Sequence, residues 1–415
     1  MKIQTVKGTQ DIFGKNAIFY KKIKNLFVST AKKYGYSEII TPILEYKKLF
    51  VRNQNDSSDI VQKQMYCLND MAGRELVLRP EGTPGVIRSI VNNNLYDISR
   101  VKAYYLSSVF RYERPKKMTY RQFTQFGIEN IGTDNIYYDI EVILLGFNIL
   151  KKLNFKKINL KINSLGDSTS QKNYKDMLKK FFSPYVKNMC KDCKNRFLKN
   201  PLRILDCKEE EDKKIIKKAP KIIDFLNNES SERFKKTLNI LEKIKIPFEI
   251  DHTLVRGLDY YNHTVFEYNV NNEEIAIGGG GHYSHLVKEI GGKDLDGTGF
   301  AFGVERIFES LKKYDITPEI KETRITIIPI NENNYEKSII IAEKIRQIKD
   351  YEVNILFEKQ KIKTLFSKAK KINSNFVIII GDEELKNNNI VVKNMSTHKE
   401  TIVHDNEINN FFNLL

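Results

Sequence analysis

The chain has 415 residues, enough for two or three domains at roughly 150 residues each. Its 69 Lys and Arg residues against 52 Asp and Glu residues leave a formal net charge of +17. This charge excludes an acidic solvating tail and makes a polyanionic partner the first hypothesis, although a general bias toward Lys and Asn would also produce much of it. Hydrophobic residues form 41% of the chain, which excludes disorder throughout, and no apolar run approaches the roughly 20 residues of a membrane span.

The cysteines and the first residues indicate the compartment. Cys67, Cys190, Cys193 and Cys207 are too few for a disulfide scaffold in a chain of this length, so a reducing compartment is favoured. Residues 1–6 contain neither an apolar leader core nor an Arg- and Ser-rich leader. We therefore predict a cytoplasmic protein with no membrane association.

The first part of the chain predicts helices and strands in mixed order. Apolar residues at helical spacing predict a helix over residues 17–33, and a strand at 36–40 follows. Thr83 is predicted to cap a helix that has Pro84 at its first position and ends near residue 91. A basic loop at 113–119 then joins two strands, and a helix and a further strand follow. These four elements are predicted at residues 103–112, 120–131, 139–150 and 158–162.

Residues from about 166 to 246 differ from what precedes them. Lysine-rich amphipathic stretches with little strand signal predict helices, which indicates a helical insertion into the sheet domain. The helices are predicted at residues 172–182, 212–218 and 231–243. Strand character then returns at 248–255 and 264–270. A glycine cluster at 278–281 and a glycine-rich segment at 297–303 follow, and a helix is predicted at 304–313.

The last hundred residues have the pattern of a separate domain. Residues 318–323 are predicted to be a linker. Strands then alternate with helices, which favours a small α/β domain with a largely parallel sheet. The strands are predicted at 325–330, 351–357, 376–380 and 390–393, and the helices at 335–349, at 362–372 and from Asp405 onward.

One predicted strand offers a polar surface for a ligand. Because side chains alternate across a strand, Phe123, Gln125, Gly127 and Glu129 share one face, and the other face is more apolar. A polar face with one aromatic ring suits a planar polar ligand. An ordinary solvated sheet face is the competing interpretation.

Three arginines suggest a site for phosphates. The chain contains no phosphate-binding loop or dinucleotide fingerprint, so a nucleotide would be held by side-chain cations. Arg111, Arg256 and Arg306 each lie beside a predicted strand end or a glycine. Three guanidinium groups suit a triphosphate and would stabilise charge that moves during phosphoryl or adenylyl transfer. For Arg306, an ion pair with the adjacent Glu305 or with another acid is the competing interpretation.

Other candidates are weaker. Glu81 could accept hydrogen bonds from a ligand ammonium group or could simply complement a helix N-terminus. Three of the cysteines are near one another in sequence without an obvious fourth ligand, so buried or inert thiols are favoured over structural zinc. His282 and His285 have no carboxylate partner close in sequence. We assign no metal ligand.

Several segments together resemble one known family. The segments are VKGTQD at 6–11, GYSEIITP at 35–42, LRPEGT at 78–83, VFRYERP at 109–115 with RQF at 121–123, NPLRILD at 200–206, LVRGLDYY at 254–261, GFAFGVER at 299–306 and GDEEL at 381–385. They resemble histidyl-tRNA synthetase, a class II aminoacyl-tRNA synthetase, over essentially the whole chain. The resemblance implies an α+β fold. Residues 1–320 would be an antiparallel-sheet catalytic domain with a helical insertion at about 166–246, and residues 324–415 an α/β anticodon-binding domain.

The resemblance also implies where ATP and its chemistry lie. Arg111 would hold the α-phosphate and the substrate carboxylate, Arg306 would hold the far end of the triphosphate, and Phe123 would stack on adenine. Arg256 would stabilise the α-phosphate during attack, so Arg256 and Arg111 are the implied catalytic residues. The implied ATP-binding residues are Arg111, Glu113, Tyr120, Phe123 and Arg306, with Mg²⁺ as cofactor.

The implied histidine site is built from polar groups. Glu81, Thr83 and Gln125 would receive the ammonium group, and Glu129 would accept a hydrogen bond from the ring N–H. A site of buried polar partners rejects analogues that lack them. The full implied set is Glu81, Thr83, Arg111, Gln125, Glu129, Arg256, Tyr260, Tyr261 and Tyr283. Two positions depart from the family pattern: the segment His282-Tyr283-Ser284-His285, and Thr119, where a basic residue is common.

The implied partners are L-histidine, tRNA(His) and a second copy of the chain in a homodimer. Arg114, Lys116 and Lys117 would contact the tRNA. A non-catalytic histidine-sensing regulatory subunit of histidine biosynthesis is the alternative, because it resembles the same catalytic core. Such paralogues usually lack the C-terminal domain and the Arg256 motif, and this chain has both. A class II synthetase for another amino acid is disfavoured by Tyr260 and Tyr261.

Overall fold

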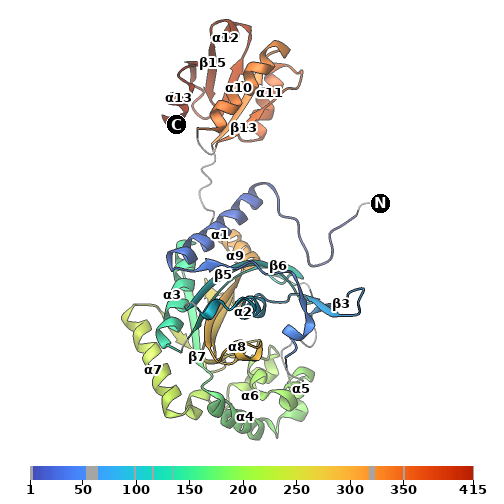
Figure 1. Ribbon diagram of the computed structural model, residues 1–415, viewed down its shortest axis with the longest axis vertical. Coiled ribbons are helices and arrows are strands. Elements are labelled where there is room, and N and C mark those ends of the chain that lie inside the picture. Colours follow the sequence, from blue (N-terminus) through green and yellow to red (C-terminus); the bar gives the residue numbers. More distant parts are fainter. Residues whose placement is uncertain are drawn as a thin grey trace. The chain divides into compact units, whose positions relative to one another are not determined.

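The computed structural model describes residues 3–52, 64–97, 100–114, 116–132, 134–316, 323–348 and 351–414. The chain divides into two compact units, Met1–Pro318 and Glu319–Leu415. Of the linker predicted at 318–323, all but Thr323 lies outside the described residues. Figure 1 shows the two units, each with its own sheet and helices.

A large sheet organises the first unit. Within the described residues it has eight strands, in the order β1-β5-β6-β11-β10-β9-β7-β8. The inner pairs, from β5 to β7, are all antiparallel, and only the edge strands β1 and β8 pair in parallel. In the order of the sheet, the strands are Ser37–Glu38, Val101–Phe110, Gln122–Gly132, Asp296–Gly303, Gly278–Tyr283, Asn262–Val270, Ile158–Ser164 and Phe248–Ile250. The predicted antiparallel-sheet α+β fold is confirmed.

Helices α1 (Gly14–Lys33), α3 (Ile136–Lys152) and α9 (Val304–Lys313) pack on one face of this sheet (Figure 1). Helix α1 places Phe19, Ile23 and Phe27 four residues apart, and all three are buried. The ring of Phe27 lies 4.9 Å from that of Phe126 on β6 and 6.0 Å from that of Phe302 on β11, measured between centroids. This apolar face leaves the other face of β6 for polar residues, as the alternation predicts.

The opposite face carries α2 (Thr83–Asn92), α8 (Leu286–Glu289) and most of the helical segment between β7 and β8, whereas the last helix of that segment, α7, packs beside α3 on the first face. That segment is helical, as the sequence indicates. Its helices are α4 (Ser168–Phe182), α5 (Lys191–Lys199), α6 (Glu210–Ile216) and α7 (Asn228–Lys243), with a 3₁₀ turn η5 at Pro201–Asp206.

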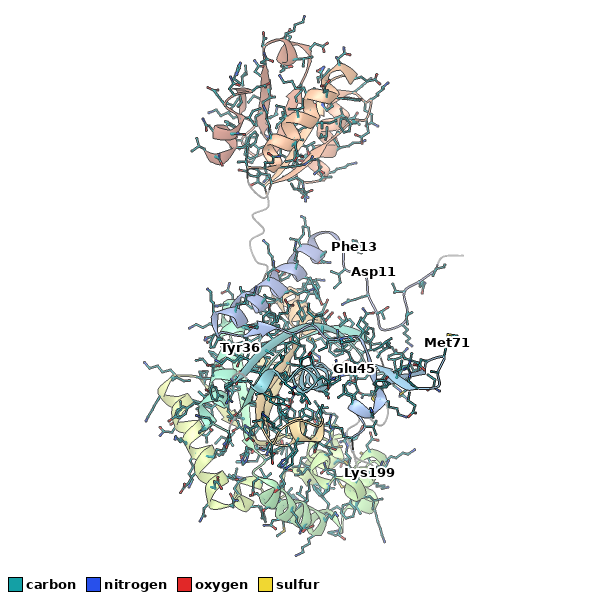
Figure 2. The ribbon with its side chains drawn as sticks, in the orientation of Figure 1. Asp11, Phe13, Tyr36, Glu45, Met71 and Lys199 are labelled. Atoms are coloured by element: carbon teal, nitrogen blue, oxygen red, sulfur yellow. The ribbon has the colours of Figure 1, made fainter. Side chains whose placement is uncertain are left out.

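A three-stranded sheet near the N-terminus has no counterpart in the sequence-based prediction. It is ordered β2-β4-β3, with strands Leu44–Tyr46, Glu75–Leu78 and Tyr66–Asn69. Met71 is fully exposed at the β3–β4 turn and points away from the strands (Figure 2). The strands are short and mostly exposed, so they lack the apolar alternation by which strands are recognised.

The second unit contains a five-stranded sheet in the order β13-β12-β14-β15-β16. The two pairs of β12 are parallel, as predicted, whereas β14–β15 and β15–β16 are antiparallel, so the prediction of a largely parallel sheet holds for β12, β13 and β14 alone. A short turn joins β15 to β16, and two strands so connected can pair only in antiparallel fashion. In sheet order, the strands are Glu352–Ile355, Arg324–Pro329, Phe376–Ile380, Asn389–Asn394 and Glu400–His404. The helices are α10 (Tyr335–Arg346), α11 (Ile362–Lys371), α12 (Asp382–Lys386) and α13 (Ile408–Leu414).

The other predicted elements occur with shifted ends, except that the strand predicted at 248–255 is short. Strand β8 ends at Ile250 because Asp251 starts a turn, in which its Oδ1 atom accepts hydrogen bonds from the backbone N–H and the hydroxyl of Thr253. No helix in the described part of the chain is long and apolar enough to cross a membrane.

Candidate active site

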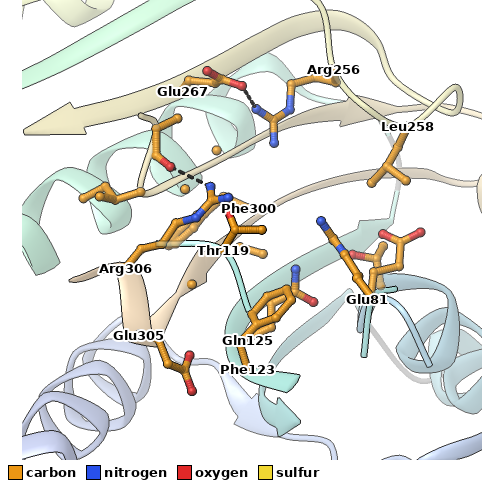
Figure 3. Close-up of a pocket in the computed structure, with 18 of the residues that line it drawn as sticks. Glu81, Thr119, Phe123, Gln125, Arg256, Leu258, Glu267, Phe300, Glu305 and Arg306 are labelled. Carbon is orange, nitrogen blue, oxygen red and sulfur yellow. Dashed lines mark hydrogen bonds and ion pairs between the residues drawn. The ribbon is translucent and has the colours of Figure 1, made fainter. Parts of the chain in front are cut away.

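A polar pocket opens on the face of the large sheet that carries α2 (Figure 3). It holds about 930 Å³ of empty volume, its open mouth included. The predicted site residues that line it are Glu81, Thr83, Arg111, Glu113, Tyr120, Phe123, Gln125, Arg256, Tyr260, Tyr261 and Arg306. They come from α2, β6, α9 and the loops after β4, β5 and β8. The fold therefore brings together residues up to 225 positions apart, from Glu81 to Arg306.

All three predicted phosphate-binding arginines reach this pocket. The Nε–H group of Arg111 donates to the carbonyl of Pro80 at 2.9 Å, and its guanidinium carbon lies 5.4 Å from the centroid of the Phe123 ring. Arg306 donates to the carbonyls of Met118 and Ala276 at 3.1 and 2.9 Å. Both guanidinium groups are thus held by neutral carbonyls, so their positive charge is not cancelled by a carboxylate in these bonds.

The alternative interpretation of Arg306 as an ion-pair partner of Glu305 is wrong. The Glu305 carboxylate accepts hydrogen bonds from the backbone N–H of Thr124, at 2.8 and 2.9 Å, and from the hydroxyl of Tyr20 at 2.7 Å. Glu305 therefore fixes the start of β6 to α9 and α1, and Arg306 points into the pocket.

Arg256 is the most constrained of the three. It forms an ion pair with Glu267 on β9 (Figure 3). Burial opposes its charge, but Glu267 raises the pKa of Arg256 above its usual value. Among the residues that the structure describes, its Nε atom is one of the buried polar atoms without a hydrogen-bond partner. Burial, and then the nearby charges of Arg111 and Arg256, lower the pKa of Arg306. The pocket thus gathers three guanidinium groups, of which Arg256 is paired with Glu267.

At the other end of the pocket, Glu129 lies beneath the lining with 1% of its surface exposed. Its carboxyl accepts hydrogen bonds from the hydroxyls of Thr83 and Tyr283, both at 2.6 Å. Burial raises the pKa of Glu129 to about 8, although both hydroxyls lower it. The rings of Tyr260 and Tyr261 lie 5.7 and 6.3 Å from that of Tyr283. The site thus holds a titratable carboxyl among aromatic rings.

The predicted cap at Thr83 is wrong. The residue before α2 is Gly82, no side chain caps the helix, and the Thr83 hydroxyl bonds to Glu129 instead. Beside it, the Glu81 carboxylate accepts a hydrogen bond from the hydroxyl of Tyr260 at 3.0 Å. Gln125 accepts one from the backbone N–H of Gly82 at 2.8 Å. The start of α2 is therefore a polar wall of the pocket rather than a capped terminus.

Comparison with known proteins agrees with this geometry. Residues 8–307 match the family described as Histidyl-tRNA synthetase. The chain belongs to this family. Residues 324–413 match the family described as Anticodon binding domain.

Individual relatives match along nearly the whole chain. The Histidine–tRNA ligase of Geobacillus sp. (strain WCH70) is 41% identical, with 97% of each chain covered. That of Listeria monocytogenes (strain EGD-e) is 42% identical, with 98% of this chain and 97% of the relative covered. The crystal structure of apo histidyl-tRNA synthetase from S. aureus superposes with a TM-score of 0.83 at 33% identity, and covers 99% of this chain and 100% of its own.

The glycines of this histidyl-tRNA synthetase family member let side chains approach the sheet. A Cβ atom at Gly299 on β11 would overlap the carboxyl of Glu129, and one at Gly279 on β10 would lie 2.7 Å from Nη1 of Arg256. The glycine clusters are visible in the sequence. The reason for glycine at these positions becomes clear only from the sheet, in which β10 lies beside β9 and β11 lies beside β6.

The predicted tRNA-binding residues lie beside the pocket rather than in it. Lys116 and Lys117 line a second depression, together with Lys312 and Lys313 of α9, and Arg114 is exposed. Thr119, the departure from the family pattern, is buried and lines the main pocket.

His282 has carboxylate partners that its sequence neighbours do not supply. Its Nδ1 atom lies 3.0 Å from Asp139 on α3, and its Nε2 atom lies 3.2 Å from Asp296 on β11. Burial opposes protonation of His282, but Asp139 and Asp296 raise its pKa to about 9. Burial likewise opposes the charge of Asp139, but His282 and Arg233 of α7 lower its pKa to about 2. This is a buried charge network one residue from Tyr283, and its carboxylates come from positions distant in the sequence.

Sequence reasoning missed the residues that hold the site residues in place. Glu267 pairs with Arg256, Glu305 anchors β6, and Arg203 of η5 donates to the backbone carbonyl of Arg256. The sequence contains one indication for Glu267. It is an acidic residue two positions after the apolar Val265, so the two side chains share one face of a predicted strand. Arg203 lies in the family-like segment at 200–206, whose pattern alone indicates no contact with Arg256.

Proposed function

We propose that the protein activates L-histidine with ATP to give histidyl-adenylate and pyrophosphate, and then transfers the histidyl group to the 3′ end of tRNA(His). The observation that carries this proposal is one pocket with three arginines at one end and a buried carboxyl among tyrosines at the other. The first end suits a triphosphate, and the second suits a ring that donates a hydrogen bond.

The ATP end combines charge with one aromatic ring. Phe123 would stack on adenine, and Arg306 would hold the far end of the triphosphate, where two carbonyls already fix its guanidinium group. Arg111 would hold the α-phosphate together with the carboxylate of histidine. Glu113 and Tyr120 line the same region and complete the proposed ATP set.

The part of the pocket that would bind histidine is built from hydrogen-bond acceptors. The Glu81 carboxylate, the Thr83 hydroxyl and the Gln125 amide would bind the ammonium group, since all three line one wall of the pocket. Glu129 would accept a hydrogen bond from the imidazole N–H. The rings of Tyr260, Tyr261 and Tyr283 would enclose the imidazole, and their hydroxyl and π contacts favour a planar polar ring over an aliphatic side chain.

Activation requires positioning and charge stabilisation more than proton transfer. The carboxylate oxygen of histidine attacks the α-phosphorus of ATP, the bond from the α-phosphorus to the bridging oxygen breaks, and pyrophosphate leaves with the electron pair. Arg256 and Arg111 would stabilise the negative charge that builds on the α-phosphate oxygens. Mg²⁺ would arrive with ATP and neutralise its phosphate oxygens. The pocket offers the carboxylates of Glu113 and Glu267 nearby, and oxygen donors of this kind suit that ion.

Transfer requires a bound tRNA. We propose that Arg114, Lys116 and Lys117 contact it next to the active site. We also propose that residues 324–415 form the anticodon-binding domain and that residues 1–320, with the insertion at about 166–246, form the catalytic domain. The match of 324–413 to anticodon-binding domains supports the first assignment. We propose the cytoplasm as the location, because ATP and tRNA are available there for translation.

A homodimer is proposed from the segment at 35–42 and the two residues that follow it. Ile40, which follows β1, exposes 84% of its surface, and Ile43 and Leu44 expose 45% and 48%. Exposed aliphatic side chains so close together are typical of surfaces that pack against a partner. The same segment resembles the dimer-forming motif of the family.

Pyrophosphate exchange with each amino acid tests the function. Exchange that depends on histidine is expected, and exchange with a different amino acid, or with none, would contradict the proposal. The regulatory-paralogue alternative predicts histidine binding without exchange. The intact arginine set and the presence of residues 324–413 make that alternative the weaker one.

A further inference from the structure

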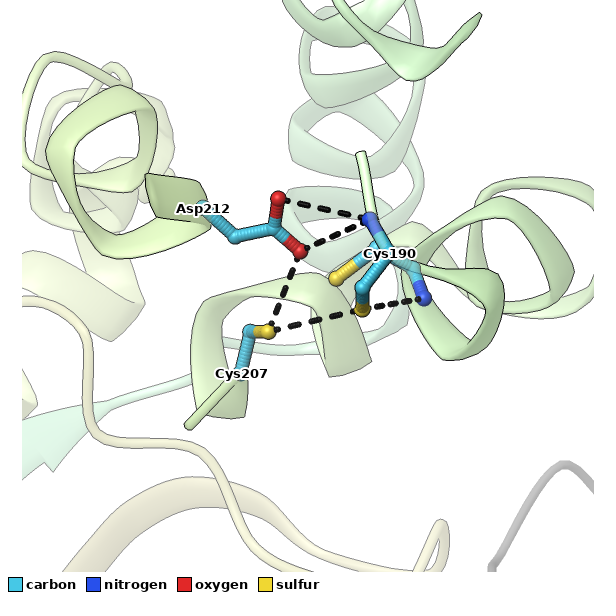
Figure 4. A group of neighbouring side chains, drawn as sticks. Cys190, Cys207 and Asp212 are labelled. Carbon is cyan, nitrogen blue, oxygen red and sulfur yellow. Dashed lines mark hydrogen bonds between the residues drawn. The ribbon is translucent and has the colours of Figure 1, made fainter. Parts of the chain in front are cut away.

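Three thiols and one carboxylate converge in the helical insertion, away from the pocket (Figure 4). The ligand atoms of Cys190, Cys193, Cys207 and Asp212 all lie within 4.8 Å of one another. Cys190 precedes α5, Cys193 lies in the first turn of that helix, Cys207 follows η5, and Asp212 lies on α6. The missing fourth ligand, which the sequence did not reveal, is therefore Asp212.

The distances from Cys207 to Cys190 and Asp212 are close to those of a tetrahedral site. The Sγ atoms of Cys190 and Cys207 are 3.8 Å apart, and the Sγ atom of Cys207 is 3.2 Å from Oδ2 of Asp212. Zn–S bonds of about 2.3 Å at tetrahedral angles place two sulfurs about 3.8 Å apart, and a Zn–O bond of about 2.0 Å places sulfur and oxygen about 3.5 Å apart. The side chains are already close to where the ion needs them.

The surroundings also fit a closed metal site. Cys193, Cys207 and Asp212 expose 0%, 6% and 3% of their surfaces. The backbone N–H of Cys193 donates to Cys190 Sγ at 3.4 Å, and the backbone N–H of Cys190 donates to the Asp212 carboxylate at 3.2 and 3.4 Å. Such outer hydrogen bonds orient first-sphere ligands and stabilise their negative charge.

We propose that Cys190, Cys193, Cys207 and Asp212 bind one Zn²⁺ ion in a structural site. All four positions are filled by protein ligands, which leaves none open for substrate. Three thiolates select a soft divalent ion over Mg²⁺ or Ca²⁺. The alternative for the same arrangement is a redox pair, in which Cys190 and Cys207 form a disulfide.

The metal would brace the segment that supports Arg256. The chain between Cys193 and Cys207 contains Asn200 and Arg203. Asn200 donates to Asp259 at 3.2 Å, and Arg203 donates to the backbone carbonyl of Arg256. Zn²⁺ would fix both ends of this segment and thereby hold the loop that carries the α-phosphate arginine. This second step rests on the proposed function, whereas the metal site itself does not.

Metal analysis of the full-length protein tests the site. Protein purified under reducing conditions without chelator, or reconstituted with Zn²⁺, is expected to hold about one equivalent of zinc per chain. Substitution with Co²⁺ should give the visible absorption of a tetrahedral thiolate site. Cys207→Ser should lose most of the zinc, and Asp212→Cys should retain it with a fourth thiolate. Cys67→Ser is the matched control, because Cys67 is exposed on β3.

Several outcomes would overturn the site. These are a reconstituted wild-type protein without zinc, equal zinc loss in Cys67→Ser, or a mass spectrum that shows a Cys190–Cys207 disulfide in the reduced, freshly purified protein. Far-ultraviolet circular dichroism of Cys207→Ser checks that it folds. If it does not fold, the Co²⁺ spectra of the wild type and of Asp212→Cys decide whether the metal site exists.

The bracing role has its own readout. Removal of zinc should increase amide hydrogen exchange in residues 200–207 and 254–260, and should lower kcat for histidine-dependent pyrophosphate exchange about tenfold with a smaller change in the Kd for histidine. Unchanged hydrogen exchange at 254–260 would refute the bracing role. If zinc-loaded protein shows no histidine-dependent exchange at all, the proposed function fails while the metal stoichiometry still stands.

Discussion

The hydroxyl of Thr83 donates a 2.6 Å hydrogen bond to the carboxyl of Glu129, and so joins the first turn of α2 to the middle of β6. Tyr283 of β10 donates to the same carboxyl from the other side at 2.6 Å. Three elements therefore meet at one buried acid. Each carboxyl oxygen accepts one of these hydrogen bonds and keeps a further acceptor position, which a ligand N–H group would use in the proposed function.

The first prediction concerns Glu129 and pH. Its pKa of about 8 means that the carboxyl is mostly neutral at lower pH, where it loses its negative charge and becomes a weaker acceptor for the imidazole N–H. Histidine binding should therefore weaken by about tenfold per pH unit as the pH falls below about 8, until the ring of free histidine also titrates near about 6.5. Calorimetric titration across this range measures the slope.

Glu129→Gln should raise the Kd for histidine by about 10- to 100-fold and remove the slope above about pH 7, because the amide does not titrate. Glu274→Gln is the matched control, since Glu274 is exposed between β9 and β10. If the pH dependence of histidine affinity persists in Glu129→Gln, a group other than Glu129 causes it.

The sequence predicts the site residues better than it predicts what holds them. Arg256 belongs to the family-like segment at 254–261, and Glu129 lies on the polar face that strand alternation predicts for residues 120–131. Their partners Glu267 and Tyr283 come from other strands, and the register that brings them together is fixed by packing across the sheet. Likewise, Asp212 joins the cysteines only because α6 folds back on α5.

The second prediction concerns Arg256. Arg256→Ala should lower kcat for adenylate formation by about 10²- to 10³-fold with a much smaller effect on histidine binding, since its contact strengthens as charge builds on the α-phosphate. Arg256→Lys should recover only part of the loss, because a lysine cannot donate two parallel hydrogen bonds. Single-turnover adenylate formation and equilibrium histidine binding separate the two effects. The control is Arg74→Ala on the exposed hairpin, and equal losses in binding and catalysis would refute a transition-state role.

The third prediction concerns the buried pair of His282 and Asp139. The folded pKa of His282, about 9, lies above its unfolded value near about 6.5. The pair should therefore stabilise the fold fully below about pH 6.5 and lose that contribution as the pH rises through about 9. Arg233, Asp134 and Asp296 also face the imidazole, and His263 packs 5.5 Å from it with its own pKa lowered to about 4 by burial, so His263 stays neutral across this range.

His282→Asn should lose on the order of 3 kcal/mol of stability at neutral pH, and the difference from wild type should shrink above about pH 9. Urea unfolding at several pH values measures both effects. His285→Asn is the matched control, because His285 is exposed three residues away. A difference that stays constant with pH would exclude the titration of His282 as its source.

The fourth prediction tests the homodimer. Ile40→Asp places a charge on the exposed aliphatic surface that we propose to be buried between two copies, so the variant should sediment as a monomer where wild type sediments as a dimer. Ile402→Asp is the matched control on β16, where Ile402 exposes 69% of its surface. A monomeric wild-type protein, or an equal effect of both substitutions, would contradict the proposed interface.

The fifth prediction tests the tRNA surface and assigns part of the +17 charge. If Lys116 and Lys117 contact phosphates, their joint replacement by alanine should weaken tRNA binding at low salt. It should also reduce the slope of log K against log salt by about one per lysine. The control replaces Lys32 and Lys33, two exposed lysines at the end of α1, by alanine. If both double variants lose the same affinity and slope, the binding reflects the overall charge of the chain, and the loop has no particular role. If only the loop variant does, the excess of lysines elsewhere is a compositional feature without a part in this contact.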